Sequence, residues 1–161
     1  MRLGPVALSC TIALVAACTK ADQEPAAADT ATTSVGPAPG AALSLADLTG
    51  TWNAVATPEG GTDTTTTRYT MVATADTTGW TITFANRPGE AIPLRGILVD
   101  GDSVVSEAGP FESSRRAGVQ TTTRTVLRMQ GDRLVGATMA RYAMRDEDQT
   151  LVLRTEATRA P

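Results

Sequence analysis

A series of short, strand-prone runs constrains the fold of this chain more than any other sequence feature. Eight such runs follow one another, at residues 51–57, 65–75, 79–84, 92–99, 102–107, 119–129, 132–143 and 149–158. Each is bounded by glycine, proline, asparagine or aspartate, and threonine, which favours strands, supplies 27 of the 161 residues. Short strands separated by turn residues are typical of a small barrel or sandwich. We therefore expect an all-β domain.

The connections between these runs alternate in length. The links at 76–78, 100–101 and 130–131 have two or three residues and contain Asp or Gly, as tight hairpin turns do. The other four links are longer and lie at 58–64, 85–91, 108–118 and 144–148. If successive strands are antiparallel neighbours, the short turns share one end of the sheet and the long loops share the other. This predicts an eight-stranded antiparallel up-and-down β-barrel with one closed end and one mouth.

Alternation along the runs indicates which side chains point into the barrel. The inward set is Trp52, Ala54, Ala56, Tyr69, Met71, Ala73, Trp80, Ile82, Phe84, Leu94, Gly96, Leu98, Leu134, Gly136, Thr138, Ala140, Tyr142, Leu151, Leu153, Thr155 and Ala157. The runs 102–107 and 119–129 fit either phase. Because bulky rings alternate with small side chains, the interior is either filled or contains a pocket lined by the aromatic residues.

The longest loop, 108–118, is the best surface candidate for binding. Phe111 stands at its tip, and Arg115 and Arg116 follow. This phenylalanine either contacts a ligand or partner at the mouth or folds back over the core. The candidate ligand-binding residues are Tyr69, Trp80, Phe84, Phe111 and Tyr142.

The N-terminus has the pattern of a secretory signal. Arg2 precedes an apolar run at 6–17 that is too short to span a bilayer. The run ends in Leu14-Val15-Ala16-Ala17-Cys18, which resembles the lipobox of bacterial lipoproteins. The resemblance implies removal of residues 1–17 and acylation of Cys18, and two or three acyl chains would anchor the protein stably.

The same resemblance implies a place in the bacterial cell envelope. Thr19 rather than Asp follows the cysteine, which in this family indicates the outer membrane, with the protein facing the periplasm or the cell surface. The alternative is cleavage by a general signal peptidase after Ala17 or Ala21, with Cys18 incidental.

The next segment, 18–43, is predicted to be a disordered tether. Residues 19–42 are rich in Ala, Thr, Pro and Gly, with one valine and no aromatic residue. Such a segment buries too little apolar area to offset the entropy of ordering it. The barrel domain is then expected at 44–161.

Composition excludes several kinds of chemistry. The chain has no histidine, and both cysteines, Cys10 and Cys18, precede the barrel domain, so the domain has no thiol and no imidazole. A net charge of −3 provides no basic surface for nucleic acid. The carboxylates of Asp100 with Asp102 and of 146–148 flank turns, where Asp is expected for backbone reasons. We expect no enzymatic activity, no metal site and no cofactor.

The segment Leu48-Thr49-Gly50-Thr51-Trp52 places a G-x-W motif at the start of the first strand. It follows a predicted helical turn that begins at Ser44. With eight meandering strands, this motif resembles the lipocalin-like (calycin) barrels over residues 44–159. The resemblance implies that Gly50, Trp52 and Arg159 close the barrel, with the tryptophan plugging the closed end and the arginine packing across it. The family's other short motifs are absent from the sequence.

Two functions follow from these features. The first is a membrane-anchored lipoprotein whose small lipocalin-like barrel binds a small hydrophobic ligand through its mouth. The second is a structural or protein-interaction module of the cell envelope, with a filled core and an envelope protein as partner.

Overall fold

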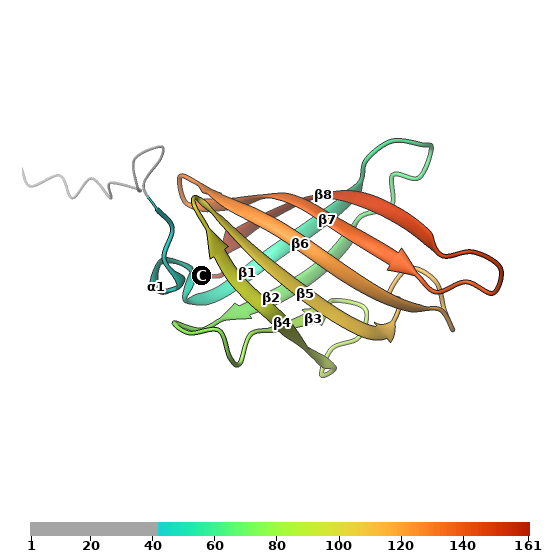
Figure 1. Ribbon diagram of the computed structural model, residues 1–161, viewed down its shortest axis with the longest axis horizontal. Helices are drawn as coiled ribbons and strands as arrows, with labels where there is room; N and C mark the ends of the chain where they lie inside the picture. Colours follow the sequence, from blue (N-terminus) through green and yellow to red (C-terminus); the bar gives the residue numbers. More distant parts are fainter. Residues whose placement is uncertain (1–41) are drawn as a thin grey trace, which may run out of the picture. The chain divides into compact units, whose positions relative to one another are not determined.

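Each strand of the chain pairs with its neighbours in sequence, and the first strand pairs with the last (Figure 1). The computed structural model describes residues 42–161. One helical turn, α1 (Leu45–Leu48), precedes the strands β1 (Gly50–Pro58), β2 (Thr67–Ala73), β3 (Thr81–Phe84), β4 (Ala91–Asp100), β5 (Ser103–Glu112), β6 (Gln120–Gln130), β7 (Arg133–Tyr142) and β8 (Gln149–Arg159). All pairs are antiparallel, so the predicted eight-stranded up-and-down barrel is confirmed.

The predicted signal segment, Cys18 and all but the end of the tether lie outside the described residues. Within residues 42–161, no helix has the length and apolar character needed to cross a bilayer. Leu43, which the sequence analysis assigns to the tether, is buried, and its backbone N–H donates to the carbonyl oxygen of Gly101 at 3.0 Å. Leu43 therefore packs against the barrel.

A capped helical turn starts the domain. Ser44 is the N-cap of α1, and the Ser44 and Asp47 side chains each accept a hydrogen bond from the other residue's backbone N–H. This capping box satisfies donors that a helix start leaves free. The turn buries Leu48, whose carbonyl accepts a hydrogen bond from the Trp52 indole at 2.8 Å.

The residues predicted to close the barrel meet beside α1. Trp52 is fully buried, and the guanidinium carbon of Arg159 lies 4.4 Å from the centroid of its ring. The same guanidinium donates to the carbonyl oxygens of Thr49, at 2.8 Å, and Asp47. Gly50 has φ +131°, and a Cβ there would lie 3.0 Å from an Arg159 nitrogen. Gly50, Trp52 and Arg159 thus lie together beside α1.

A bulge in β4 reverses its alternation. The register with β5 shifts between Arg95 and Leu98, and Gly96 has φ +58°. Ile97 is consequently buried, whereas Leu98 is 60% exposed. The prediction that Leu98 points inward is wrong, because the extra residue at the bulge turns the following side chains to the other face.

The β5 strand is longer than predicted and continues to Glu112. Its register with β6 shifts between Ala108 and Phe111, after which Phe111 points into the barrel and is buried. Phe111 therefore belongs to the barrel wall and not to a loop tip. On β6, Thr121 and Leu127 are buried, which assigns the phase that the sequence left open.

Candidate functional site

A small chamber lies inside the barrel. Its volume is about 60 Å³, and four of the five predicted ligand-binding residues line it: Tyr69, Phe84, Phe111 and Tyr142. An apolar cavity that binds benzene has roughly 150 Å³. The chamber as it stands therefore has room for ordered water or a few heavy atoms.

The fifth predicted residue, Trp80, does not line this chamber. It is buried directly before β3, and its indole N–H donates to the carbonyl of Asp76 in the β2–β3 turn at 2.8 Å. The β2–β3 turn is one of the short connections, so Trp80 belongs to the packed core. Trp80 therefore lies apart from the four predicted residues that line the chamber.

Aromatic rings form one side of the chamber. The Tyr69 and Phe84 rings meet edge to face, with centroids 5.9 Å apart, and the Phe84 and Phe111 centroids are 5.5 Å apart. Such contacts stabilise the rings beyond their burial. Tyr69 and Phe84 are also a cross-strand pair of β2 and β3, so the sheet itself sets the first contact.

Hydroxyl groups form the side that β6 and β7 contribute. Thr125 and Thr138 bond to each other at 3.0 Å, and Thr138 bonds to the fully buried Thr155 of β8 at 2.8 Å. The Tyr69 hydroxyl lies beside Thr155 and Thr138; burial raises the pKa of Tyr69 to about 12, and these hydrogen bonds oppose the rise. The interior thus contains a buried network of neutral hydroxyl groups.

Residues 113–118, which we call the lid, cover the chamber. Ser113 is buried, and its hydroxyl accepts hydrogen bonds from the backbone N–H groups of Arg115 and Arg116, both at 3.1 Å. Ser113 is therefore the residue that folds the lid into a turn.

Arg115 ties the lid to the β1–β2 loop. Its guanidinium lies 2.5 Å from the Asp63 carboxylate and donates to the Thr65 carbonyl and to the Thr67 hydroxyl, the latter at 3.1 Å. Hydrogen bonds from Thr65 and Arg115 hold the pKa of Asp63 below its usual value of 3.8. Asp63 is therefore ionised at neutral pH.

Arg116 ties the lid to the β7–β8 side of the mouth. Its guanidinium carbon lies 4.6 Å from the centroid of the Tyr142 ring, and it donates to the Gln149 side chain at 2.7 Å. The β3–β4 loop adds a hydrogen bond from Asn86 to the Ser114 carbonyl at 3.1 Å. All four long connections thus meet at the lid.

An outer cleft lies on the other side of the lid. It has a volume of about 440 Å³ and is lined by residues of the long loops. Four residues line both the chamber and the cleft: Thr67, Ser114, Arg115 and Tyr142. These side chains separate the chamber from the outer cleft.

Two of the acidic groups considered from the sequence have structural partners. The Asp148 carboxylate lies 2.8 Å from the Arg141 guanidinium, and Asp102 accepts a hydrogen bond from Ser103 at 2.8 Å. In the part of the chain that the structure describes, no group of three or more His, Cys, Asp or Glu side chains is placed to hold a metal ion.

No family model, curated protein or solved structure matches this chain. The function must therefore be inferred from the site itself. Sequence reasoning identified the aromatic side of the chamber and the two arginines of the lid. It also placed Thr138 and Thr155 inside the barrel, but it missed Thr125, because the alternation of the run 119–129 fits either phase.

Proposed function

We propose that this protein binds a small molecule inside its barrel and that the lid controls entry. The observation that carries the proposal is the shared lining of the chamber and the cleft by Thr67, Ser114, Arg115 and Tyr142. Outward movement of the lid would join a chamber of about 60 Å³ to a cleft of about 440 Å³. The joined space has the size of ordinary ligand sites, which enclose roughly 300–1,000 Å³.

The contacts of the lid support its role as the moving part. The lid lies outside the strands, and Arg115 and Arg116 hold it through side-chain contacts with Asp63, Thr67, Tyr142 and Gln149. The Arg115 side chain is 12% exposed and that of Asp63 is 55% exposed, so their ion pair is half-buried. The strands below, in contrast, are joined by continuous pairing on both sides and cannot separate without unfolding the barrel.

We also propose that the domain is a lipocalin-like barrel on a lipid-anchored protein. The G-x-W motif and the Arg159–Trp52 contact support the first part, and the lipobox at Cys18 supports the second. The mouth lies at the end of the barrel opposite α1, where the chain enters the domain (Figure 1). A ligand would then enter at the end of the barrel opposite α1.

Native mass spectrometry of gently purified protein tests the ligand-binding proposal. We expect a co-purifying compound in the natural chain and its loss in Ala140→Leu, which fills the chamber from its wall. Ser106→Val is a second variant that fills the chamber, and it provides the same test if Ala140→Leu does not fold. Arg124→Ala, on the outer wall, is the control that should keep the ligand. A natural chain that neither carries nor takes up an apolar fluorescent dye would contradict the proposal.

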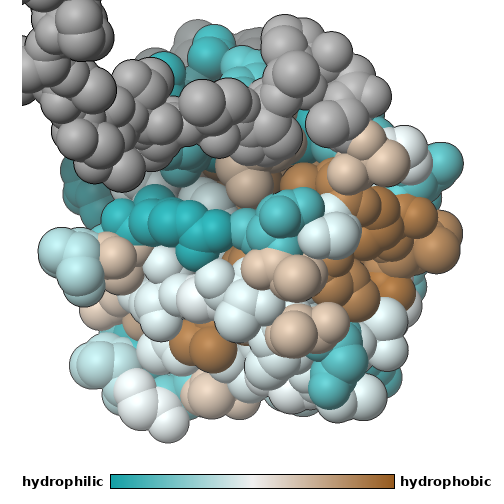
Figure 2. Space-filling model, turned by 90° about the vertical axis from the view of Figure 1, so that its left-hand side faces the viewer, coloured by the Kyte–Doolittle hydropathy of each residue, from teal (hydrophilic) through white to brown (hydrophobic). Residues whose placement is uncertain are grey.

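The outer wall favours the second candidate, an interaction module of the envelope. Leu98, Val105, Val126 and Ala137 are successive cross-strand neighbours on the outward phase of β4 to β7. Figure 2, which faces the α1 end, shows hydrophobic side chains gathered along one side of the molecule. Apolar surface gathered on an outer wall marks an interaction site when it is large enough. Crosslinking in cells from position 98 should then capture one envelope protein reproducibly, and Leu98→Glu should abolish it.

A further inference from the structure

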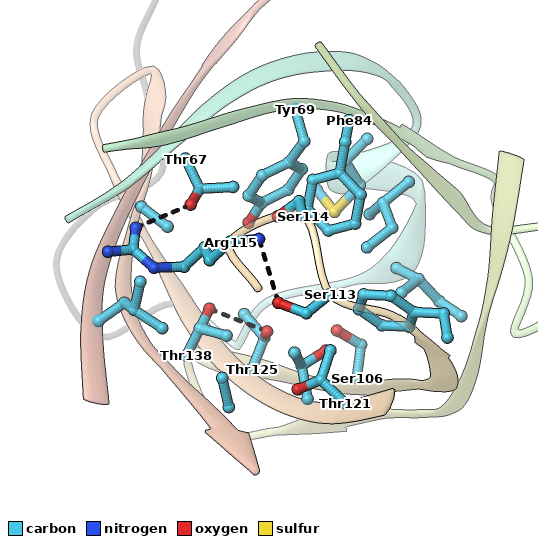
Figure 3. Close-up of a pocket in the computed structure, with 18 of the residues that line it drawn as sticks. Thr67, Tyr69, Phe84, Ser106, Ser113, Ser114, Arg115, Thr121, Thr125 and Thr138 are labelled. Atoms are coloured by element: carbon cyan, nitrogen blue, oxygen red, sulfur yellow. Dashed lines mark hydrogen bonds between the residues drawn. The ribbon is translucent and has the colours of Figure 1, made fainter. Parts of the chain in front are cut away.

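The two sides of the chamber differ in chemistry, and this difference restricts what can bind. Figure 3 shows the Tyr69 and Phe84 rings on one side and the hydroxyl groups of Thr125, Thr138 and Ser106 on the other. A ligand that fills the space would have one face against the rings and one edge against the hydroxyls.

Ser106 of β5 provides an unused hydrogen-bonding group. Its side chain lines the chamber and is only 7% exposed, yet it makes no hydrogen bond within residues 42–161. In this part of the chain, every fully enclosed side-chain oxygen has a partner. The Ser106 oxygen must therefore face the open space of the chamber. Thr123, which is partly buried, also lines the chamber and makes no side-chain hydrogen bond within residues 42–161.

The charge of the lining excludes an ionic ligand. Arg115 is the one charged residue that lines the chamber in the described part, and its guanidinium already contacts Asp63, Thr65 and Thr67. A carboxylate or ammonium group inside would lose its water without gaining a free opposite charge, which is costly. The ligand should therefore be uncharged.

The volume limits the size of the ligand and requires the lid to move. At about 60 Å³ the closed chamber is smaller than the roughly 150 Å³ of a cavity that holds benzene. Displacement of Ser114 and Arg115 toward the outer cleft is the change that adds space without opening the sheet. One ring then fits against the aromatic side.

We propose, on the basis of the proposed ligand-binding function, that the ligand is an uncharged single-ring compound with a hydroxyl or carbonyl oxygen. Its ring packs against Tyr69, Phe84 and Phe111. Its oxygen bonds with the hydroxyls of Ser106 and Thr123. A phenol is the simplest member of this class.

Titration calorimetry with three matched probes tests this inference. The probes are p-cresol, toluene and 4-methylbenzoate, and the protein is the full chain with Cys18→Ala, so that no acyl chain competes for the chamber. We expect p-cresol to bind about three- to tenfold more tightly than toluene, which is the effect of one neutral hydrogen bond. The carboxylate should bind at least tenfold more weakly than p-cresol.

Variants on β5 distinguish the contribution of the hydrogen bond to the affinity from the contribution of packing. Ser106→Ala should reduce the preference for p-cresol, because one of the two hydroxyl partners is lost, and leave the affinity for toluene unchanged. Ser103→Ala, on the same strand and bonded to Asp102 outside the chamber, should preserve the preference. Equal binding of p-cresol and toluene, or tighter binding of 4-methylbenzoate, would overturn the inference while leaving the ligand-binding function intact. Failure of all three probes to bind would overturn both.

Discussion

At the scale of single residues, Tyr69 shows how burial couples an ionisable group to folding. Burial raises its pKa to about 12 from an ordinary value of 10, and the hydroxyls of Thr155 and Thr138 lie beside it. The folded barrel therefore favours the protonated phenol more strongly than the unfolded chain does. The corresponding stabilisation is fully present below pH 10 and is lost as the pH rises from 10 to 12.

The first prediction is an alkaline loss of stability that depends on Tyr69. The free energy of unfolding should fall by about 2–3 kcal/mol between pH 10 and pH 12, measured by urea denaturation. Tyr69→Phe should remove most of this fall, whereas Tyr142→Phe, on the same chamber, should retain it. An equal fall in the Tyr69→Phe variant would show that other groups cause the pH dependence.

The second prediction concerns Trp52, which is fully buried and contacts Leu48 and Arg159. Trp52→Ala should lower the free energy of unfolding by about 3–5 kcal/mol, because it empties a core site and removes the cation–π contact. Urea denaturation of the variant and of Val55→Ala, an exposed position on the same strand, provides the comparison. A melting temperature equal to that of the natural chain would mean that Trp52 does not seal the barrel.

At the scale of elements, the lid depends on a carboxylate that stays ionised in mild acid. Hydrogen bonds from Thr65 and Arg115 lower the pKa of Asp63 below 3.8. A lowered pKa means that the contact contributes above pH 3.8 and is lost as the pH falls through the folded-state value. The lid should therefore remain closed across the physiological range.

The third prediction follows from this contact. Hydrogen exchange at the amides of Arg115, Arg116 and Gly118, corrected for intrinsic rates, should show equal protection at pH 7 and pH 5 and less protection once the pH falls below the lowered pKa of Asp63. Asp63→Asn should reduce the protection already at pH 7, because the charge partner of Arg115 is removed. Asp102→Asn, at a turn outside the lid, should leave the protection of these amides unchanged. Loss of lid protection between pH 7 and pH 5 would contradict the assignment of Asp63.

Strand order and loop asymmetry could be predicted from sequence because turn residues and alternation are local signals. The details that shape the chamber could not be predicted from the sequence. Gly96 fits an alternating pattern as a small inward residue, and only pairing with β5 shows that it is a bulge. Phe111 follows Gly109-Pro110, which suggests a loop, yet β5 resumes its pairing with β6 at that point. The lid contact of Arg115 with Asp63 joins residues 52 positions apart, which no local pattern indicates.

At the scale of the whole molecule, we propose that the barrel and the segment before it have separate tasks. The strands bury their own core and pair with one another, and the described residues include no membrane-spanning helix. The lipobox at Cys18 supports the proposal that acyl chains attach the protein to a membrane. Two or three chains anchor a protein stably, whereas a single chain binds reversibly.

The fourth prediction is that Cys18 decides where the protein is found. When the natural chain is produced in a bacterial cell with two membranes, it should sediment with the membranes, resist extraction by high salt, and dissolve in detergent. Cys18→Ala should lose the acyl chains and the lipoprotein cleavage together, while Cys10→Ala, inside the signal segment, should behave like the natural chain. The measurements are membrane fractionation and intact mass. An unacylated natural protein, released after cleavage at Ala17 or Ala21, would contradict the lipobox assignment and leave the barrel as a secreted binding domain.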